Sequence, residues 1–449
     1  MRRFALGRWG TWGTRACRVL LGLVVPCASQ AQFIGEYLPS AVPGYQQEPG
    51  VTVGSRLRPL YQPMGARIGD FVLHSDLLET TGYNSNVAGF GNSPGSWLLR
   101  TAPSLAINSD WSRNQIGAAF TADDAHFLST PRQNYTDWTA SLGGGYTIGR
   151  RDLVLGYSHL SLHEDPTQIG SVLSSTPIPY QVEDLRSSYT FDRGRLSFEP
   201  RVDAQLYRYG DATLLGVPVG QQNENRLVLT AGMETRYALS DLRSLVFVVE
   251  GIDSSYVDEP SYQPTDSSKS VLALGGIDYQ ESSLWRYRLL VGIETRQFDA
   301  PQYASHTAPI IAASVVWTPT GMTTVTGTLS RTIEDPAAAG TGGYTYTRGR
   351  LVIDHEYLRN VLLEGHVGFE NADFLQGGGT QRNVSFGAGV HWLLGRQVRL
   401  GLDYSFLAQS GSGVNANLNV APAKSGAFVG LRSPSFDRNV ALLSLRFSW

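Results

Sequence analysis

The stretch from Asn225 to Leu239, NRLVLTAGMETRYAL, decides the fold class. Alternate positions from Leu227 to Leu239 are apolar or aromatic, with Thr235 as the exception. The interleaved positions from Arg226 to Ala238 carry most of the charge of the segment. Successive side chains of a strand point to opposite faces, so this period of two predicts a strand with one apolar and one polar face.

The same pattern recurs along the chain. Residues 285–296 and 383–392 alternate in the same way, with Leu290 as an apolar exception on the polar face of the first. The texture stays constant from about Gly65 to Trp449, in segments of roughly 10–14 residues separated by turn residues. One architecture is therefore expected throughout this region.

The connections between these segments alternate in length. Short polar turns are expected at Asp110–Asn114, Gly149–Asp152, Asp192–Arg195, Ser240–Arg243, Glu281–Leu284, Thr318–Gly321, Leu358–Val361 and Leu394–Gln397. Longer polar stretches lie near 84–96, 127–136, 163–179, 209–224, 253–269, 298–307, 333–345, 371–381 and 408–437. Eight short and nine long connections predict about 18 strands, within a range of 16–20 set by uncertain boundaries.

Alternating short and long connections are typical of outer-membrane barrels, which have short periplasmic turns and long extracellular loops. A sheet in lipid must close because lipid satisfies no backbone group. Beyond the first 31 residues no stretch reaches the 18 or so apolar residues of a membrane helix. The predicted fold class is all-β: a transmembrane β-barrel of about 18 antiparallel strands.

Composition supports this class. Charged residues make up 17% of the 449-residue chain, against about 25% in soluble proteins, and Gly is abundant at 49 residues. The net charge is −3, and the 36 Lys and Arg residues do not gather into a basic stripe, so nucleic acid is not an expected partner.

The first 31 residues have the features of an export signal. Five arginines precede the apolar run Val19–Val25, and small residues at Ser29 and Ala31 suit cleavage after Ala31. Cleavage would remove both cysteines, Cys17 and Cys27, and shift the net charge from −3 to −8. The expected domains are a signal peptide at 1–31, an irregular, Pro-rich periplasmic extension at 32–64 and a barrel at 65–449.

The last strand and the aromatic residues indicate how the barrel sits in the membrane. A strand that ends in Trp449 resembles the signal read by the outer-membrane assembly machinery, which is therefore an expected partner. Other aromatic residues cluster beside the short turns, where a periplasmic girdle belongs. The girdle candidates are Trp111, Tyr146, Phe191, Tyr237, Trp285, Tyr287, Trp317, Trp392, Phe447 and Trp449.

The start of the barrel resembles a known family. Pro63, Gly65, Arg67, Gly69, Phe71 and Leu73, then Tyr83–Val87, Pro103–Leu105 and Ser109–Ser112, are similar to the putative beta-barrel porin type 2 family. The resemblance implies a Gram-negative outer-membrane barrel in contact with lipid and lipopolysaccharide. Some members are encoded beside exopolysaccharide genes, which makes a saccharide export or uptake channel the alternative function.

Charged residues on the polar faces are candidates for the pore lining. They are Arg186, Arg226, Glu234, Arg236, Glu250, Asp278, Arg286, Arg288, Glu294, Arg296, Arg350, Asp354, Glu364, Arg399 and Asp403. They form either a mixed-charge channel or salt-bridge ladders that brace the wall; a polar interior implies a wet lumen or a polar plug in both cases. On the channel interpretation, Leu229→Arg should impair folding and Arg226→Ala should be tolerated.

The expected function is passage of small hydrophilic solutes. The eight histidines are scattered, no HExxH occurs, and no GxSxG nucleophile elbow is recognised, so no enzyme, metal or cofactor is expected. An outer-membrane barrel enzyme and a structural or adhesive barrel are less favoured alternatives. Loop 408–437 is expected to extend the wall outward, with loop 163–179 the next candidate for a constriction. A homo-oligomer is compatible with the size of the chain.

Overall fold

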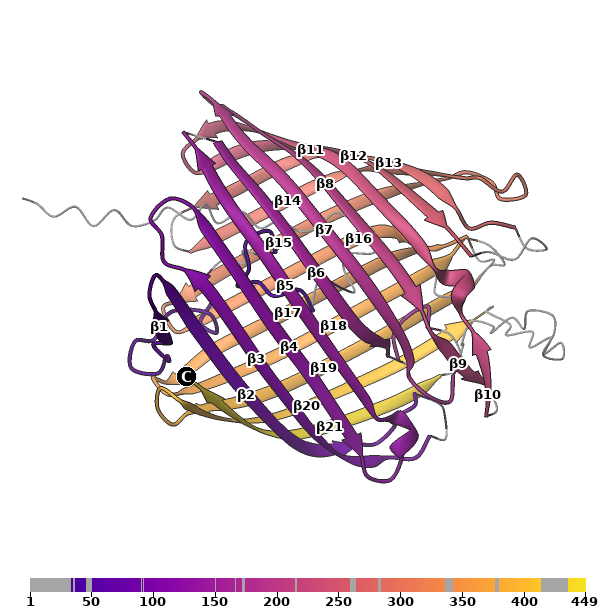
Figure 1. The fold of residues 1–449 in the computed structure, drawn as a ribbon, viewed down its shortest axis with the longest axis horizontal. Coiled ribbons are helices and arrows are strands. Elements are labelled where there is room, and N and C mark those ends of the chain that lie inside the picture. The colour runs from indigo at the N-terminus through magenta and orange to yellow at the C-terminus, as the bar shows by residue number, and fades with distance from the viewer. Residues whose placement is uncertain are drawn as a thin grey trace, which may run out of the picture.

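The computed structural model describes residues 34, 37–45 and 51–449, except positions 90, 92, 150, 166, 172–173, 215, 259–263, 282–283, 336–341, 376–378 and 413–434. The expected signal peptide and most of loop 408–437 thus lie outside the described residues. Eighteen strands form the wall (Figure 1). They are β2 (Phe71–Asn84), β3 (Ser96–Ser109), β4 (Gln115–Phe127), β5 (Tyr135–Ile148), β6 (Arg151–Glu164), β7 (Ile178–Arg193), β8 (Leu196–Tyr209), β11 (Arg226–Ser240), β12 (Arg243–Tyr256), β13 (Ser268–Glu281), β14 (Trp285–Phe298), β15 (His306–Thr320), β16 (Thr323–Glu334), β17 (Tyr344–Leu358), β18 (Val361–Phe374), β19 (Thr380–Leu393), β20 (Val398–Ser412) and β21 (Phe436–Ser448).

The wall closes on itself. Every wall strand pairs antiparallel with the next, and β2 pairs with β21 from Asp76–Ser448 to Asn84–Val440. Smaller elements accompany the wall: β1 (Ala66–Ile68), which pairs with β2, the hairpin of β9 (Asp211–Leu214) and β10 (Val217–Gly220), and the single 3₁₀ turns Pro131–Gln133 and Gln222–Glu224. The closed antiparallel barrel of 18 strands confirms the predicted fold class.

The two ends of the barrel differ as the connection lengths predicted. All eight predicted short turns join consecutive wall strands, as where β11 ends at Ser240 and β12 begins at Arg243. The longer connections join the strands at the opposite end. We call these the short-turn end and the long-loop end, which correspond to the periplasmic and extracellular sides of such barrels.

The alternation along each strand separates the two faces of the wall. On β11, Leu229 and Met233 are each 45% exposed, whereas Val228 and Thr230 between them are buried. The exposed positions are apolar because they point outward, toward lipid in a barrel of this kind. Among the described residues, no helix combines the length and apolar character needed to cross a membrane.

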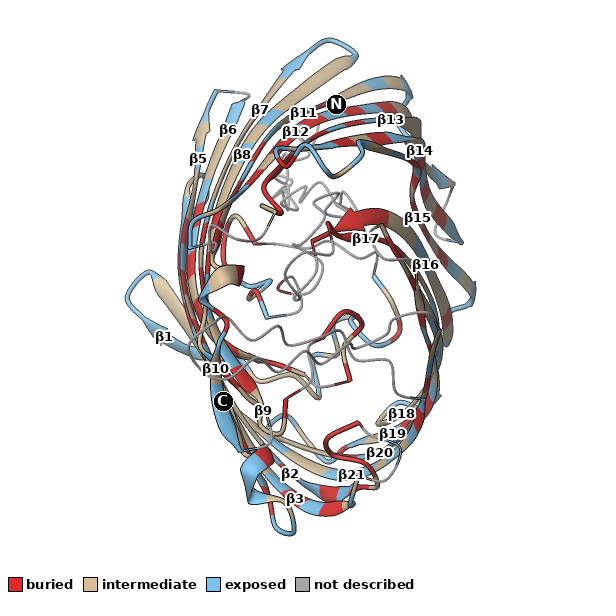
Figure 2. Ribbon diagram, turned by 90° about the vertical axis from the view of Figure 1, so that its right-hand side faces the viewer, coloured by how far each residue is buried: buried red, intermediate tan, exposed pale blue. Residues whose placement is uncertain are grey.

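The buried positions face the inside of the barrel. Figure 2 looks into the ring of strands and shows buried segments of chain within it. The largest inward-facing apolar cluster near the start of the chain joins Ile34, Leu38, Val42 and Tyr45 to Leu160, Val182 and Tyr207. Part of the chain before the first strand therefore packs against the inner face of the wall.

Candidate functional site

The predicted lining residues all lie at inward-facing positions of the wall. On β11, for example, the buried Val228 points inward and the exposed Leu229 points outward. Arg226, Glu234 and Arg236 lie an even number of residues from Val228 and therefore also point inward. The most deeply buried of them lie on β11, β12 and β14: Arg226, Glu234, Glu250, Arg286, Arg288, Glu294 and Arg296. Only Arg350 of the set is exposed. Seven of the fifteen predicted residues are therefore shielded from open solvent.

One ladder of ion pairs braces the wall from β8 to β14. The guanidinium of Arg288 lies 2.7 Å from the carboxylate of Glu234, which also bonds Arg236. Arg236 reaches Asp278 on β13 at 3.5 Å, and Glu250 pairs with Arg201 of β8. Each of these carboxylates pairs with an arginine on another strand, so the ion pairs link the strands of this part of the wall to one another. Removing one partner of a buried pair would leave an uncompensated charge.

Arg226 lies in a cage of aromatic rings. Its guanidinium carbon is 4.7 Å from the ring centre of Tyr207 and 5.5 Å from those of Tyr209 and Tyr256. Its Nε lies 3.9 Å from the carboxylate of Asp335. The side chain is 4% exposed and is part of the packed interior. Arg226→Ala would remove all of these contacts, so these contacts argue against the expectation that the change is tolerated.

The predicted residues on β17–β20 form a looser group. Asp354 faces Glu364 across the β17–β18 pair, and Asp403 lies 3.5 Å from His391. Arg399 faces Arg446 across the β20–β21 pair. Like charges therefore stand opposite each other at two places, Asp354 with Glu364 and Arg399 with Arg446. Within the described wall, these side chains do not form ladders of ion pairs with each other.

The segment before the first strand enters the barrel. Tyr45 is buried, its hydroxyl donates to the backbone carbonyl of Asp184 at 3.0 Å, and its ring lies 5.3 Å from the guanidinium of Arg186. Burial raises the pKa of the Tyr45 hydroxyl. Two inward glycines make room for the segment: a Cβ on Gly143 would stand 1.9 Å from the Pro43 carbonyl oxygen, and one on Gly156 would stand 2.8 Å from the Tyr45 ring.

A second described stretch before the first wall strand lies at the short-turn end. The Val53 amide donates to the Thr324 hydroxyl at 3.0 Å, and Arg58 bonds Glu356 at 2.9 Å. Val53 also packs with Leu362 and Leu393. The sequence predicts an irregular periplasmic extension at residues 32–64; its described residues contact the inner face of the wall, Tyr45 beside β7 and Val53 beside β16.

A long loop also folds inward. Thr167, Ile169 and Ser171 of the β6–β7 connection are buried, and the Gly170 amide donates to the Gln381 side chain on β19 at 3.0 Å. This contact crosses the lumen, because β19 lies on the far side of the ring from β6. Loop 163–179 thus narrows the long-loop end, in the manner that its sequence interpretation as a constriction candidate predicted.

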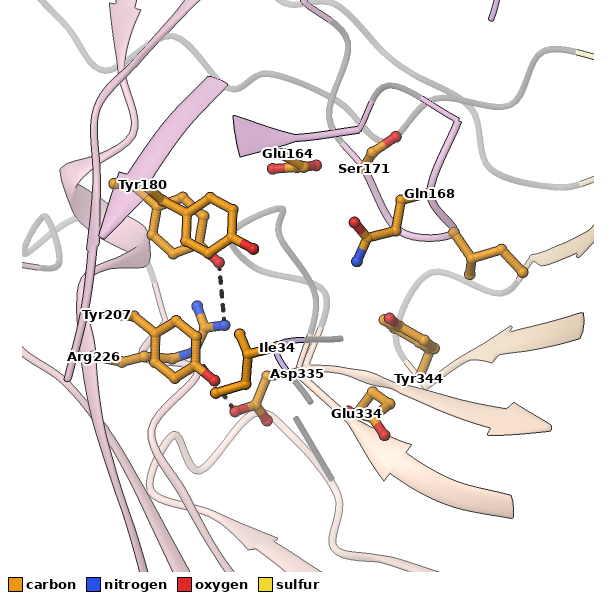
Figure 3. A pocket seen from close by; sticks show the side chains of 12 residues that line it. Ile34, Glu164, Gln168, Ser171, Tyr180, Tyr207, Arg226, Glu334, Asp335 and Tyr344 are labelled. Carbon is orange, nitrogen blue, oxygen red and sulfur yellow. Dashed lines mark hydrogen bonds and ion pairs between the residues drawn. The ribbon is translucent and has the colours of Figure 1, made fainter. Parts of the chain in front are cut away.

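A small cavity of about 50 Å³ remains beneath this loop (Figure 3). Arg226, Glu334 and Asp335 line it together with tyrosines, among them Tyr207 and Tyr344. Burial alone would raise the pKa of Asp335, but the Arg296 and Arg226 guanidiniums and the Ser254 hydroxyl hold it below its usual value. The carboxylate is therefore ionised in a neutral cell and fixed between two cations.

A much larger cavity, of about 860 Å³, runs along the opposite side of the lumen. Its lining comes from β2–β5 and β21, with Tyr37–Ser40 and part of the inward loop. Arg438 lies near the long-loop end of β21 and Arg446 near its short-turn end, and both line the cavity. The open space therefore follows the length of the wall.

Charges in this larger cavity are mostly paired with each other. Arg100 bonds Asp123 through both nitrogens of its fork, with Nε at 2.6 Å. His163 lies 2.9 Å from Asp137, and Arg438 lies 3.8 Å from Asp165. Burial raises the pKa of Asp165, but Arg438 and hydrogen bonds from Thr167 outweigh it and lower the pKa below its usual value.

These observations define a barrel with a polar, partly filled lumen, and sequence comparison agrees. The model of the family described as putative beta-barrel porin 2 matches residues 58–423. The chain belongs to this family. The resemblance at the start of the barrel is thereby confirmed. Among curated proteins, none matches the sequence.

Solved structures of outer-membrane proteins are similar in fold to this family member. Pseudomonas aeruginosa OccK1 (OpdK) is 12% identical, over 84% of this chain and 99% of that one, with a TM-score of 0.47. P. aeruginosa OccK2 (OpdF) is 10% identical, over 84% and 98%, with a TM-score of 0.44. The FrpB iron transporter of Neisseria meningitidis is 9% identical, over 84% and 81%, with a TM-score of 0.41.

The residues of the open side were not among the predicted lining. Arg100, Arg438 and Arg446 are all absent from that set, although each sits on the polar face of an alternating segment. The signal that could have found them is the same period of two, applied to the first and last strands. Among the described residues, no three or more His, Cys, Asp or Glu side chains are grouped to hold a metal ion.

The girdle candidates on wall strands lie at outward positions next to the short turns. Trp285 and Trp317 stack with ring centres 5.2 Å apart, and Tyr287 packs on Tyr279 at 4.8 Å. Trp111, Tyr146, Tyr237, Trp392 and Trp449 are exposed, whereas Phe191 and Phe447 are half-buried. A second set of exposed outward aromatics, including Tyr83, Trp97 and Trp138, lies toward the long-loop end and was not predicted.

Proposed function

We propose that this protein is an outer-membrane channel through which small hydrophilic solutes diffuse. The observation that carries the proposal is the cavity of about 860 Å³ that follows β21 along the inner wall. Aspartates, arginines, serines and threonines contribute to its lining, so water and polar solutes can enter without losing hydrogen bonds. The filled half of the lumen restricts passage to the remaining space, which favours small solutes.

The location follows from the same features. A closed barrel with an apolar outer face and aromatic residues at the short turns is suited to the outer membrane and to contact with lipid and lipopolysaccharide. We propose that residues 1–31 direct export, that the chain is mature from about Gln32, and that the strand ending in Trp449 is read by the assembly machinery. Association into homo-oligomers is compatible with this proposal.

A saccharide channel is the second candidate. The cavity pairs Arg100 with Asp123, His163 with Asp137 and Arg438 with Asp165, so much of the charge in its lining is balanced. Tyr37 and Tyr135 add aromatic rings to the lining. Paired charges and aromatic rings suit uncharged, hydroxyl-rich solutes, and current block by an added oligosaccharide would support this candidate over a general pore.

A swelling assay with reconstituted liposomes tests the main proposal. The probes are a pentose, a disaccharide and a tetrasaccharide, and we expect swelling rates to fall in that order. Ser104 lines the cavity, whereas its neighbour Leu105 points outward and is 44% exposed. Ser104→Trp should slow the swelling, and Leu105→Trp, the matched control, should leave it unchanged. Equal rates for the two variants, or no swelling with a folded wild-type barrel, would contradict the proposal.

A further inference from the structure

The barrel wall separates between β15 and β16 near the long-loop end. The ladder between these strands ends at Ile311–Arg331. β15 nevertheless stays paired with β14 as far as His306, and β16 stays paired with β17 as far as Glu334. Within the described chain, five residues of β15, 306–310, and three of β16, 332–334, therefore extend past the end of their shared ladder.

The end of β16 turns into the lumen instead of following the wall. Thr332, Ile333 and Glu334 are all buried, and Figure 2 shows the strand end beside the labels β16 and β17 inside the ring. Tyr344, at the start of β17, packs with Ile169 of the inward loop. The inward end of β16–β17 and the inward loop thus close the same part of the lumen.

Side chains of β14 replace the lost ladder partners. The Glu294 carboxylate accepts from the Ile333 amide at 3.4 Å, and Arg296 donates to the Ile333 carbonyl at 3.1 Å. Arg296 also bonds the carboxylate of Asp335, which accepts from the Ser254 hydroxyl at 2.8 Å. Both backbone groups of Ile333 are satisfied by a charged side chain, so the inward position is held by a defined latch.

We propose that the β16–β17 end is a gate, latched inward by Glu294 and Arg296, whose release lets β16 rejoin β15 and widens the lumen. Continuing the existing register would place Ala308 opposite Glu334 and Ile310 opposite Thr332. This inference rests on the proposed channel function, because widening matters only where solute passes.

Two arrangements of similar stability are what a gate requires. Inward, both backbone groups of Ile333 are satisfied by the latch. Outward, the continued register places Ile333 opposite Pro309, whose carbonyl can accept from the Ile333 N–H but which cannot donate to the Ile333 carbonyl. Pro309 lies in the separated part of β15 and has no N–H to give to that ladder. The proline therefore weakens the outward state, so that the buried latch is sufficient to hold the strand inside.

Disulfide trapping tests the gate without any transport assay. Ala308→Cys with Glu334→Cys is placed in the mature chain, which lacks Cys17 and Cys27. We expect slow cross-linking under mild oxidant, and about tenfold faster cross-linking when Arg296→Gln is added, a change of about 1.4 kcal/mol. Arg288→Gln, which breaks a buried pair elsewhere on β14, is the matched control and should leave the rate unchanged. No cross-link in either background, or equal acceleration by both arginine changes, would overturn the proposal.

A second variant locks the latch. Ser254→Cys with Asp335→Cys replaces the contact between these side chains by a covalent bond that reductant opens. We expect a larger single-channel conductance after reduction than before it, and an unchanged conductance contradicts the gate. Failure of the channel proposal is separable: a folded barrel that cross-links 308 to 334 but passes no current retains the gate and refutes the channel, whereas a conducting barrel without the cross-link refutes the gate.

Discussion

The two sides of the lumen are built from the same kind of strand but differ in what rests on them. Beside β5–β8 and β11, the inner face is covered by residues 34 and 37–45 and by the inward loop, and a cavity of only about 50 Å³ stays open. Beside β2–β5 and β21, about 860 Å³ stays open. The charged residues of the first side are buried in ladders, while those of the second line a cavity.

This difference shows that a polar inward residue is not by itself a pore residue. Arg226 and Arg446 have the same parity and the same charge, yet Arg226 is caged by three tyrosines and Arg446 borders the open cavity. What decides the role is the segment packed above the residue. Substitutions at a wall position and in a packed segment should therefore have different effects on the open side and the filled side of the lumen.

The largest effect is expected from a charge on the lipid face of the open side. Leu105→Arg should destabilise the barrel by about 2–4 kcal/mol, because a cation near the middle of the membrane loses its hydration. Ser104→Arg, one residue away, points into the cavity and should fold normally. Refolding into lipid vesicles, read by heat-modifiable migration in gels, measures both. Equal loss of folding would show that the faces are wrongly assigned.

A smaller effect is expected from displacing the segment on the filled side. Gly143→Val would drive a side chain into the Pro43 carbonyl, so residues 37–45 should leave the wall and the unit conductance should rise. Gly144→Val points outward, where a Cβ meets the nearest atom at an ordinary 3.6 Å, and serves as control. An unchanged conductance in a folded Gly143→Val barrel would mean that the segment does not restrict the lumen.

The outer rim should respond more weakly. Trp285→Leu breaks the stack with Trp317 and should cost about 0.5–1.5 kcal/mol, the usual contribution of an aromatic pair beyond its buried area. Leu289→Ala changes an exposed lipid-facing residue on the same strand and is the comparison. Denaturant titration in vesicles measures both. If the tryptophan change costs nothing, the pair does not anchor this end of the wall.

Moderate acid should leave the filled side unchanged. The pKa of Asp335 in the folded barrel is lower than the pKa of about 3.9 expected in the unfolded chain. The ion pairs of Asp335 therefore contribute fully above the unfolded pKa and are lost only as the pH falls through the lower folded pKa. Conductance at fixed ionic strength should therefore not change through Asp335 between pH 7 and about 4.5. A step that Asp335→Asn abolishes within this range would contradict the assignment.

Much of the wall was predictable because its signal is local. Alternation at 225–239 and polar turns such as Ser240–Arg243 need only neighbouring residues, and they predicted the strand number and every short turn. The packing inside the wall is not local: Tyr45 bonds Asp184, 139 residues away, and residues 32–64 carry no period that shows where they rest. The two-residue alternation also does not show whether another segment of the chain packs over an inward-facing arginine.

Some interior features did leave a trace in the sequence. The run Gly143–Gly145 is unusual for a strand, and the structure gives a reason at Gly143, the close approach of the Pro43 carbonyl. Pro309 in β15 marks the point past which β16 leaves the wall, since proline is accepted where a ladder bond is absent. The glycine run and Pro309 each mark a position where the regular strand pairing or packing changes, but neither identifies the segment that packs there.

Single-channel recording of the refolded protein, residues 32–449, in a planar bilayer tests the central claim most directly. A channel with one open side predicts stable, ohmic current steps, reduced by Ser104→Trp and unaffected by Leu105→Trp. A barrel that is shown to be folded and inserted but gives no steps would contradict the claim, because the cavity along β21 would then not connect the two ends of the lumen.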